Sequence, residues 1–175
     1  SASGEDRSGD NMQKSPFDLT GKVSIVTGGN GGIGLGMARG LARAGASVVI
    51  AGRNEAKSKD AVRDIEGLGA KAVAVSVDIT DKKAVEGMIE STLKQLGRLD
   101  ILINNAGMSV RHPAHMLSLD DWHTVLDTNL TSAFICSKAA YPAMKQAGGG
   151  KIINIGSMMS IFGASFAPAY AASKG

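Results

Sequence analysis

The chain has 175 residues, 43% hydrophobic and 20% charged, which is enough apolar material for the core of one globular domain. Its 19 basic and 16 acidic residues are interspersed and give a formal net charge of +3, and no basic run could follow a nucleic-acid backbone, so we expect no nucleic-acid partner. No apolar stretch approaches the roughly 18 residues of a membrane helix and the N-terminus has no signal-peptide pattern, so we expect a cytoplasmic protein without membrane contact.

The first residues differ in composition from the rest of the chain. Residues 1–16 are polar and begin without methionine, which predicts a disordered tail or a tag remnant. We expect residues 17–175 to form the domain, with no linker and no repeat. Cys136 is the single cysteine, so it cannot form an intrachain disulfide, and its apolar helical surroundings predict an inert packed thiol in a reducing compartment.

Short apolar runs alternate with amphipathic segments along this domain. Five runs rich in Val and Ile are predicted as buried strands: 22–27, 46–51, 71–77, 99–104 and 151–157. Between them, 32–44 reads as a helix with Ile33, Met37 and Leu41 on one face, and 81–96 as a second amphipathic helix. Repeated strand–helix–strand units predict an α/β fold with a doubly wound parallel sheet covered on both faces.

Helix boundaries are predicted from capping residues. Thr80 is expected to cap the helix that starts at 81, and Ser118, with Asp121 three residues later, the helix that starts at 119. Pro142 is expected to kink or end that long helix. Left-handed residues are expected after three helices, at Gly45, Gly69 and Gly97.

The first strand runs into a glycine-rich turn, TGGNGGIG, at 27–34 and then into a helix. Glycines at such a turn allow backbone N–H groups to approach a pyrophosphate at the positive end of the helix. A plain turn also uses glycine, but the position after the first strand of a strand–helix–strand unit favours a nucleotide site. We assign to it Gly28, Asn30, Gly31, Gly32, Ile33 and Gly34.

The end of the second strand carries Arg53 where NAD-binding folds place a carboxylate on the adenosine ribose. A guanidinium can pair with a 2′-phosphate, so NADP(H) is favoured and NAD(H) stays possible. An exposed surface arginine is the simpler alternative. Gly31 is not basic, so a second phosphate-binding cation is missing from the glycine turn.

The third and fourth strands also end in polar residues at the same sheet edge. Asp78 and Ile79 are expected to meet the adenine, although Asp78 could instead cap the next helix. The sequence NNAG at 104–107 is expected to tie one Asn to neighbouring strands and to place Asn105, Ala106 and Gly107 against the nicotinamide ribose.

Tyr170 and Lys174 form a Y-x-x-x-K pair, which a helix would place on one face. A phenol is a weak acid, with an ordinary pKa of about 10, so a catalytic tyrosine needs a neighbour that stabilises the phenolate. The ammonium of Lys174 could do this and also reach a cofactor ribose. Ser157, expected at the end of the fifth strand, could hold a substrate oxygen. Asn129, unfavourable inside a helix, could position water and Lys174 in a proton relay.

Together these motifs resemble the short-chain dehydrogenase/reductase family over residues 17–175: TGxxxGxG at 27–34, Asp78, NNAG at 104–107, Asn129, Ser157 and YxxxK at 170–174. The resemblance implies a Rossmann fold, a nicotinamide cofactor that also contacts Tyr170 and Lys174, a catalytic tetrad of Asn129, Ser157, Tyr170 and Lys174, and a homotetramer or homodimer.

The flanking sequences look most similar to sugar-acid and polyol dehydrogenases such as gluconate 5-dehydrogenase, which implies a secondary alcohol or ketone substrate. A 3-oxoacyl-carrier-protein reductase is one alternative, and a non-catalytic nucleotide-binding regulator or subunit is another. Arg111 could bind a substrate carboxylate or could be a solvated loop residue. His112 and His115 have no further ligand at metal spacing, so no metal is assigned.

Family members with this pattern run to about 250 residues, a length ordinary for one α/β domain. We therefore expect the sequence to lack the last strands of the sheet and the loop that covers the substrate, and expect weak cofactor binding and negligible turnover of a polypeptide limited to it.

Overall fold

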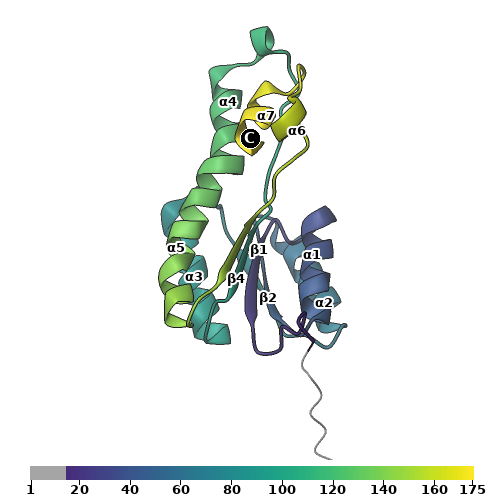
Figure 1. The fold of residues 1–175 in the computed structure, drawn as a ribbon, viewed down its shortest axis with the longest axis vertical. Coiled ribbons are helices and arrows are strands. Elements are labelled where there is room, and N and C mark those ends of the chain that lie inside the picture. Colours follow the sequence, from purple (N-terminus) through teal and green to yellow (C-terminus); the bar gives the residue numbers. More distant parts are fainter. Residues whose placement is uncertain (1–14) are drawn as a thin grey trace, which may run out of the picture.

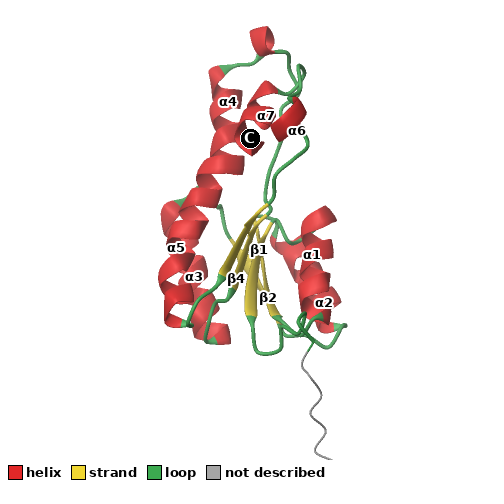
Figure 2. Ribbon diagram, viewed as in Figure 1, coloured by secondary structure: helices red, strands yellow, loops and turns green. Residues whose placement is uncertain are grey.

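The computed structural model describes residues 15–175, so most of the segment predicted as a tail, residues 1–14, lies outside the described residues. Five parallel strands form one sheet in the order β3-β2-β1-β4-β5 (Figures 1 and 2). The elements in chain order are β1 (Val23–Thr27), α1 (Gly32–Arg43), β2 (Ser47–Gly52), α2 (Glu55–Glu66), β3 (Ala72–Ser76), α3 (Lys82–Leu96), β4 (Ile101–Asn104), a 3-10 turn (Ala114–Met116), α4 (Leu119–Leu126), a π-helical segment (Asp127–Thr131), α5 (Ser132–Gln146), β5 (Lys151–Asn154), α6 (Met159–Phe162) and α7 (Pro168–Lys174).

Helices cover both faces of the sheet, which confirms the doubly wound α/β prediction (Figure 1). Consecutive residues of β1 point to opposite faces: Ile25 packs in a core with α3 and α5, whereas Val26 packs in a second core with α1 and α2. Both side chains are fully buried. The Val- and Ile-rich central strands are continuous apolar runs because both of their faces are covered.

One expected strand differs from the others. All four residues of β5 are exposed, with Ile152 at 40% and Ile153 at 45%, so the prediction of five buried strands was wrong at this position. β5 lies at the sheet edge and pairs with β4 alone among the described strands. The sequence of an apolar strand does not indicate whether the strand lies inside the sheet or at its edge. The pattern of 151–157 therefore could not predict the exposure of β5.

The predicted helix caps are confirmed except at the start of α3. Ser118 accepts a hydrogen bond from the backbone N–H of Asp121 at 3.0 Å and caps α4, as expected. The cap of α3 is Asp81 rather than Thr80, because the Asp81 carboxylate accepts from the N–H groups of Lys83 and Ala84. The predicted left-handed residues are confirmed at φ +99°, +83° and +82° for Gly45, Gly69 and Gly97.

The predicted face of the first helix is confirmed for Met37 and Leu41, which pack against the core, but it is wrong for Ile33. Ile33 is 75% exposed, and the buried residues of α1 are Gly34, Ala38 and Ala42. Small residues on this face allow α1 to lie close to the sheet. Met37 and Leu41 are only partly buried against the core.

The long helical stretch from residue 119 is not ended by Pro142. Helix α5 continues past this proline to Gln146, and the irregular part is instead the π-helical segment at residues 127–131. A π turn inserts an extra residue into the helix, and such turns are frequent at functional sites. Among the described residues, no helix combines the length and the apolar composition needed to cross a bilayer.

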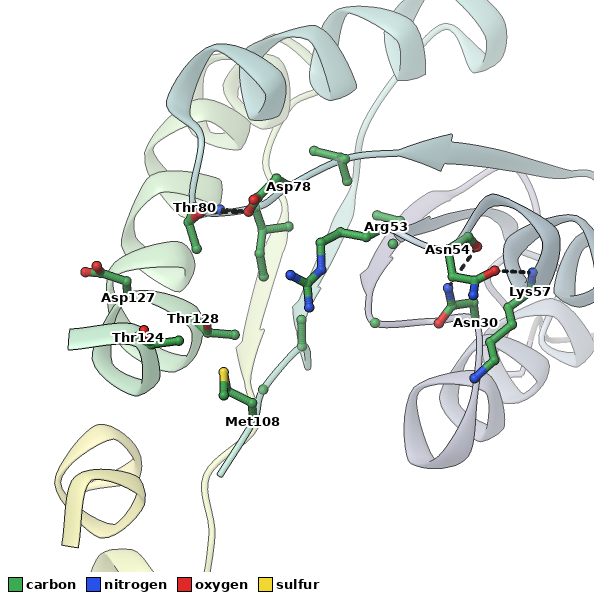
Figure 3. A pocket seen from close by; sticks show the side chains of 17 residues that line it. Asn30, Arg53, Asn54, Lys57, Asp78, Thr80, Met108, Thr124, Asp127 and Thr128 are labelled. Carbon is green, nitrogen blue, oxygen red and sulfur yellow. Dashed lines mark hydrogen bonds between the residues drawn. The ribbon is translucent and has the colours of Figure 1, made fainter. Parts of the chain in front are cut away.

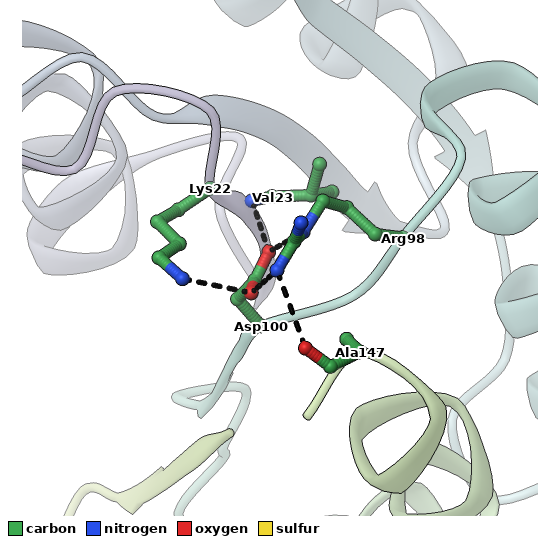
Figure 4. Close-up of polar contacts among 5 residues, drawn as sticks. All are labelled: Lys22, Val23, Arg98, Asp100 and Ala147. Carbon is green, nitrogen blue, oxygen red and sulfur yellow. Dashed lines mark hydrogen bonds and ion pairs between the residues drawn. The ribbon is translucent and has the colours of Figure 1, made fainter. Parts of the chain in front are cut away.

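A buried carboxylate joins the amino ends of the central strands (Figure 4). Asp100, with a side chain only 6% exposed, accepts hydrogen bonds from the backbone N–H of Val23 at 2.9 Å and from Arg98 Nε and Nη2 at 2.8 and 2.7 Å, and Nζ of Lys22 lies 3.5 Å away. Burial by itself raises the pKa of Asp100, but the hydrogen bonds from Arg98 and Val23 and the two nearby cations outweigh it, so the pKa is lowered. This cluster connects β1 to β4 at the edge opposite the glycine turn.

Candidate active site

A pocket of about 630 Å³ lies at the carboxyl edge of the sheet, where the chain order of the strands reverses between β1 and β4 (Figure 3). Ligands of open α/β sheets bind at such a switch point. The seven predicted cofactor residues that line the pocket are Gly28, Asn30, Arg53, Asp78, Ile79, Ala106 and Gly107. The other predicted cofactor residues lie outside its lining: Gly31, Gly32, Ile33, Gly34, Asn105, Tyr170 and Lys174.

The glycine turn packs tightly against the end of β4. Gly28 has φ +64°, and a Cβ added to it would lie 3.1 Å from Cα of Ala106. A Cβ on Gly34 would collide with the carbonyl oxygen of Gly28. At Gly31 and Gly32 an added Cβ would meet nothing within 4 Å, so the backbone at the start of α1 is open to a ligand. A Cβ on Gly29 would lie 2.9 Å from the carbonyl oxygen of Val26, so three of the five glycines are needed for packing and two leave space.

We expect Gly34→Ala to distort this turn and to weaken nucleotide binding at least tenfold, because the new methyl group has only backbone and the Asn105 amide to displace. Gly36→Ala is the matched control, since it lies on the same helix in open space and should stabilise α1 slightly through helix propensity. Fluorescence titration with NADPH and NADH measures the effect. Equal affinities for the two variants would contradict the assignment of Gly34.

Two cations and two amides surround the end of β2. The guanidinium of Arg53 projects into the pocket, and the side chain of Lys57, on the first turn of α2, extends past Asn30 (Figure 3). Asn54 caps α2 by accepting from the N–H of Lys57 at 3.0 Å, and Asn30 donates to Ser58 at 3.1 Å. Sequence reasoning missed Lys57, because only the fold shows that the first turn of α2 faces the pocket.

Asp78 does not cap the next helix, so that alternative was wrong. Its carboxylate accepts from the hydroxyl and the backbone N–H of Thr80 at 2.7 and 2.9 Å. These bonds lower the pKa of Asp78, and the charge of Arg53 lowers it further. The pocket therefore holds an ionised carboxylate at the end of β3, which is turned to Thr80 (Figure 3).

The two asparagines that end β4 tie the sheet to its surroundings. Asn104 donates to Asn154 on β5 at 2.8 Å and to Ser137 on α5 at 3.1 Å, as one Asn of this motif was expected to do. Asn105 donates to the carbonyl of Thr27 at 3.1 Å, and the Thr27 hydroxyl accepts from the N–H groups of Asn105 and Ala106. Thr27, which the sequence analysis left without a role, therefore joins the glycine turn to β4.

Asn129 lies in the π-helical segment and is buried. Its amide oxygen accepts from the N–H of Met108 at 2.8 Å, and its amide nitrogen donates to the Met108 carbonyl at 2.8 Å and to the Ser173 hydroxyl at 2.9 Å. Ser173 in turn donates to the carbonyl of Tyr170 at 2.8 Å. Both amide protons of Asn129 are thus used, and the residue connects the loop after β4 to helix α7.

Helix α7 carries both Tyr170 and Lys174, and it packs against α4 and the π-helical segment (Figure 1). The ammonium of Lys174 donates to the carbonyl of Ile155 at 2.8 Å. Burial lowers the pKa of Lys174. A Cβ built on Gly107 would lie 3.3 Å from Oδ1 of Asn129 and 3.5 Å from Nζ of Lys174, so these residues from three parts of the chain meet at one point.

Ser157 lies three residues beyond the end of β5, not within the strand as expected. It is in the loop before α6, where its Oγ accepts from the N–H of Met159 at 3.2 Å. The N–H of Ile155 still donates to the carbonyl of Asn104 at 3.1 Å, and beyond it the chain leaves the sheet to reach α6. The serine is therefore positioned by loop contacts rather than by strand pairing.

Cys136 is fully buried and unpaired, as predicted, and burial raises the pKa of its thiol to about 11. The thiol is therefore neutral and packed in the core beside α3.

Known proteins are similar to this chain in sequence. The family model described as short chain dehydrogenase matches residues 22–175. A 2-dehydro-3-deoxy-D-gluconate 5-dehydrogenase of Formosa agariphila is 39% identical over 160 residues, which are 91% of this chain and 61% of the relative. A gluconate 5-dehydrogenase of Gluconobacter oxydans is 40% identical over 159 residues, covering 91% and 62%.

Solved structures resemble the chain as well. An NAD⁺-bound xylitol dehydrogenase superposes with a TM-score of 0.86 at 34% identity, covering 89% of this chain and 60% of that one. The chain thus spans about three fifths of the length of the relatives that it matches.

Proposed function

The chain belongs to the short chain dehydrogenase family, and from this premise we propose that the whole protein interconverts a secondary alcohol and a ketone with a nicotinamide cofactor. The observation that carries the proposal is the meeting of Asn129, Gly107 and Lys174 beside a switch-point pocket, with Tyr170 one helical turn from Lys174. When bound, the cofactor supplies or accepts the hydride at the substrate carbon.

The residues fit such a group. The open backbone at Gly31 and Gly32 supports a pyrophosphate at the start of α1, and the pocket lined by Arg53, Asp78 and Ile79 supports an adenosine. Ala106 and Gly107 would lie against the nicotinamide ribose.

Each proposed catalytic residue has a distinct task. The Oγ of Ser157 already accepts a backbone hydrogen bond, so its own proton is left to donate to the substrate oxygen. The Tyr170 oxygen gives that oxygen a proton during ketone reduction and removes it during alcohol oxidation. Lys174 stabilises the phenolate by its charge. Asn129 holds α7 through Ser173, and its position near Lys174 supports a role in a water-mediated proton relay.

We propose NADP(H) as the preferred cofactor, with NAD(H) the alternative. Arg53 and Lys57 both line the end of the pocket where a 2′-phosphate would lie, and Asn30 and Asn54 are the other polar side chains there. Lys57 supplies the second cation that the glycine turn lacks. The proposal rests on these two charges and on the lack of a carboxylate at the end of β2.

We expect Lys57→Gln to weaken NADPH binding about tenfold, because a charge-assisted hydrogen bond contributes about 1.5 kcal/mol or more. NADH affinity should stay within twofold, since NADH has no 2′-phosphate. Lys59→Gln is the control: this residue lies on the same helix and pairs with Glu55. Quenching titrations with both nucleotides measure the dissociation constants. An equal loss of NADH affinity would mean that Lys57 does not contact the 2′-phosphate.

For the substrate we propose a sugar acid, because the relatives are named for gluconate and 2-dehydro-3-deoxy-D-gluconate. Arg111 is our candidate for the carboxylate. Its guanidinium lies 5.9 Å from the centre of the Phe166 ring, which links the loop after β4 to the loop before α7. The test is absorbance at 340 nm with D-gluconate, xylitol and simple ketones, using NADPH, NADH and their oxidised forms. The assay uses the whole protein: no turnover of it with any pair would refute the proposed function, and a preference for xylitol over D-gluconate would refute the sugar acid as the substrate.

We also propose a homo-oligomer in the cytoplasm. Leu130, Phe134 and Tyr141 are each at least 50% exposed on the π-helical segment and α5. An apolar surface of this kind supports association. Light scattering coupled to size-exclusion chromatography measures the assembly, and a monomer at micromolar concentration would contradict the proposal.

A further inference from the structure

We propose that Ser160 is a positioning residue that sets Lys174 relative to Ser157. The inference deepens the proposed function and rests on it, because it assumes that these two residues act on the same substrate. Ser160 lies on the four-residue helix α6 and is part-buried. It carried no role in the sequence motifs.

The Ser160 hydroxyl forms hydrogen bonds with the main chain of Ser157 and with the last turn of α7. Its oxygen accepts from the backbone N–H of Ser157 at 3.3 Å, and its proton is donated to the backbone carbonyl of Lys174. A hydroxyl has one proton and two lone pairs, so it can make these two bonds together.

Lys174 therefore forms two hydrogen bonds with the segment that follows β5. Its ammonium donates to the carbonyl of Ile155, and its carbonyl accepts from Ser160. Ser157 lies between these two attachment points in the sequence. The two contacts close a ring that contains both the candidate serine and the candidate lysine.

This ring matters because little else fixes α6. The helix has four residues, far below the length at which a helix is stable alone. Three apolar residues around it, Met158, Ile161 and Phe162, are at least 74% exposed, so apolar packing with the described residues holds it only weakly. Hydrogen bonds to Ser157 and to α7 are then the main interactions that hold α6 in position.

Without the hydroxyl, the main chain of Ser157 and the end of α7 would lose their shared contact. Of its two bonds to the segment after β5, Lys174 would keep only the side-chain bond to Ile155, and the same ammonium is also proposed to contact the cofactor ribose and the phenolate of Tyr170. We expect displacements of this kind to slow the chemical step more than substrate binding, because proton transfer depends steeply on geometry.

The experiment compares Ser160→Ala with Ser160→Thr, which keeps the hydroxyl, in the whole protein. Oxidation of D-gluconate with NADP⁺ gives kcat and KM, and fluorescence titration gives the Kd of NADPH. We expect Ser160→Ala to lower kcat about tenfold with KM changed less than threefold, and to raise the Kd about threefold. The threonine variant should recover at least half of the wild-type kcat.

Ser91→Ala is the matched control, because Ser91 accepts a hydrogen bond from Gln95 on the exposed side of α3. It should leave kcat, KM and Kd unchanged. A role in folding alone would lower the melting temperature of Ser160→Ala and leave the Kd of the folded protein unchanged, which would overturn the inference. So would a threonine variant as slow as the alanine variant.

Failure of the proposed function can be distinguished from failure of the Ser160 inference. A wild-type protein that turns over no substrate would refute that function, whereas the Kd comparison of Ser160→Ala with the wild type would still decide whether Ser160 positions Lys174. An active wild type with an unaltered Ser160→Ala variant would refute the positioning role alone.

Discussion

Replacing Tyr170 with Phe is expected to lower turnover about a thousandfold, because a positioned acid–base group contributes roughly this factor. The phenol is the group proposed to exchange a proton with the substrate oxygen, and Phe retains its shape. Tyr170 is half-buried on α7, and its backbone carbonyl accepts from Ser173, a bond that the substitution preserves. The affinity for NADPH should therefore change less than threefold.

The control is Tyr141→Phe, since Tyr141 is 62% exposed on α5, away from the pocket lining. Turnover is followed at 340 nm with D-gluconate and NADP⁺, and binding by fluorescence. If the Tyr170→Phe protein kept a tenth or more of the wild-type kcat, another group would have to be the acid–base residue. If it lost its cofactor affinity as well, the Tyr170 hydroxyl would be needed for cofactor binding and not for proton transfer alone.

Replacing Asp100 with Asn is expected to lower the free energy of unfolding by about 2 kcal/mol, since hydrogen bonds to a charged group contribute about 1.5–3 kcal/mol. Asn keeps the size of the side chain but accepts with one oxygen, so Arg98 and the N–H of Val23 cannot both be satisfied as before. Arg98 and Lys22 are 39% and 47% exposed, so their charges return to water and limit the loss. The melting temperature should fall by about 4–8 °C.

The effect of this substitution should depend on pH. The pKa of Asp100 is lowered in the folded protein, so its stabilisation is fully present above the unfolded value, about 3.9, and is lost as the pH falls through the lower folded value. The difference between wild type and variant should therefore be constant from about pH 5 to 8 and should shrink below about pH 4. Urea denaturation at several pH values measures it.

Asp64→Asn is the control for this prediction. Asp64 pairs with Arg39 through Nε at 2.6 Å, but the pair is on the surface, with side chains 36% and 43% exposed. Surface pairs contribute little, so the unfolding free energy should hardly change. A loss as large as that of Asp100→Asn would mean that burial is not what makes the Asp100 cluster stabilising.

The interior strands and helices of this domain were predictable because each has a local pattern. Alternating apolar and amphipathic segments predicted the doubly wound sheet, and glycines after helices predicted left-handed backbone that the structure confirms. The Ser118 cap was also local and was confirmed. The wrong predictions concern choices between adjacent residues, such as Thr80 against Asp81, where small differences in backbone geometry decide which side chain reaches the free N–H groups.

Other errors came from features that depend on distant residues. The exposure of β5 depends on which strands pair with it, and the exposure of Ile33 on the direction in which α1 faces the sheet. Pro142 lies in a helix that continues through it, and the irregularity falls at Asn129, where side-chain bonds to Met108 and Ser173 replace regular helical packing.

The sequence by itself determined the family motifs, their order and the residue types available for chemistry, because these are local properties of the chain. The tertiary structure alone decided which of them meet. It brought Lys57 to the pocket beside Arg53, and it joined Ser160 to both Ser157 and Lys174. Contacts between residues far apart in the sequence depend on how the helices pack on the sheet, and no local pattern records that packing.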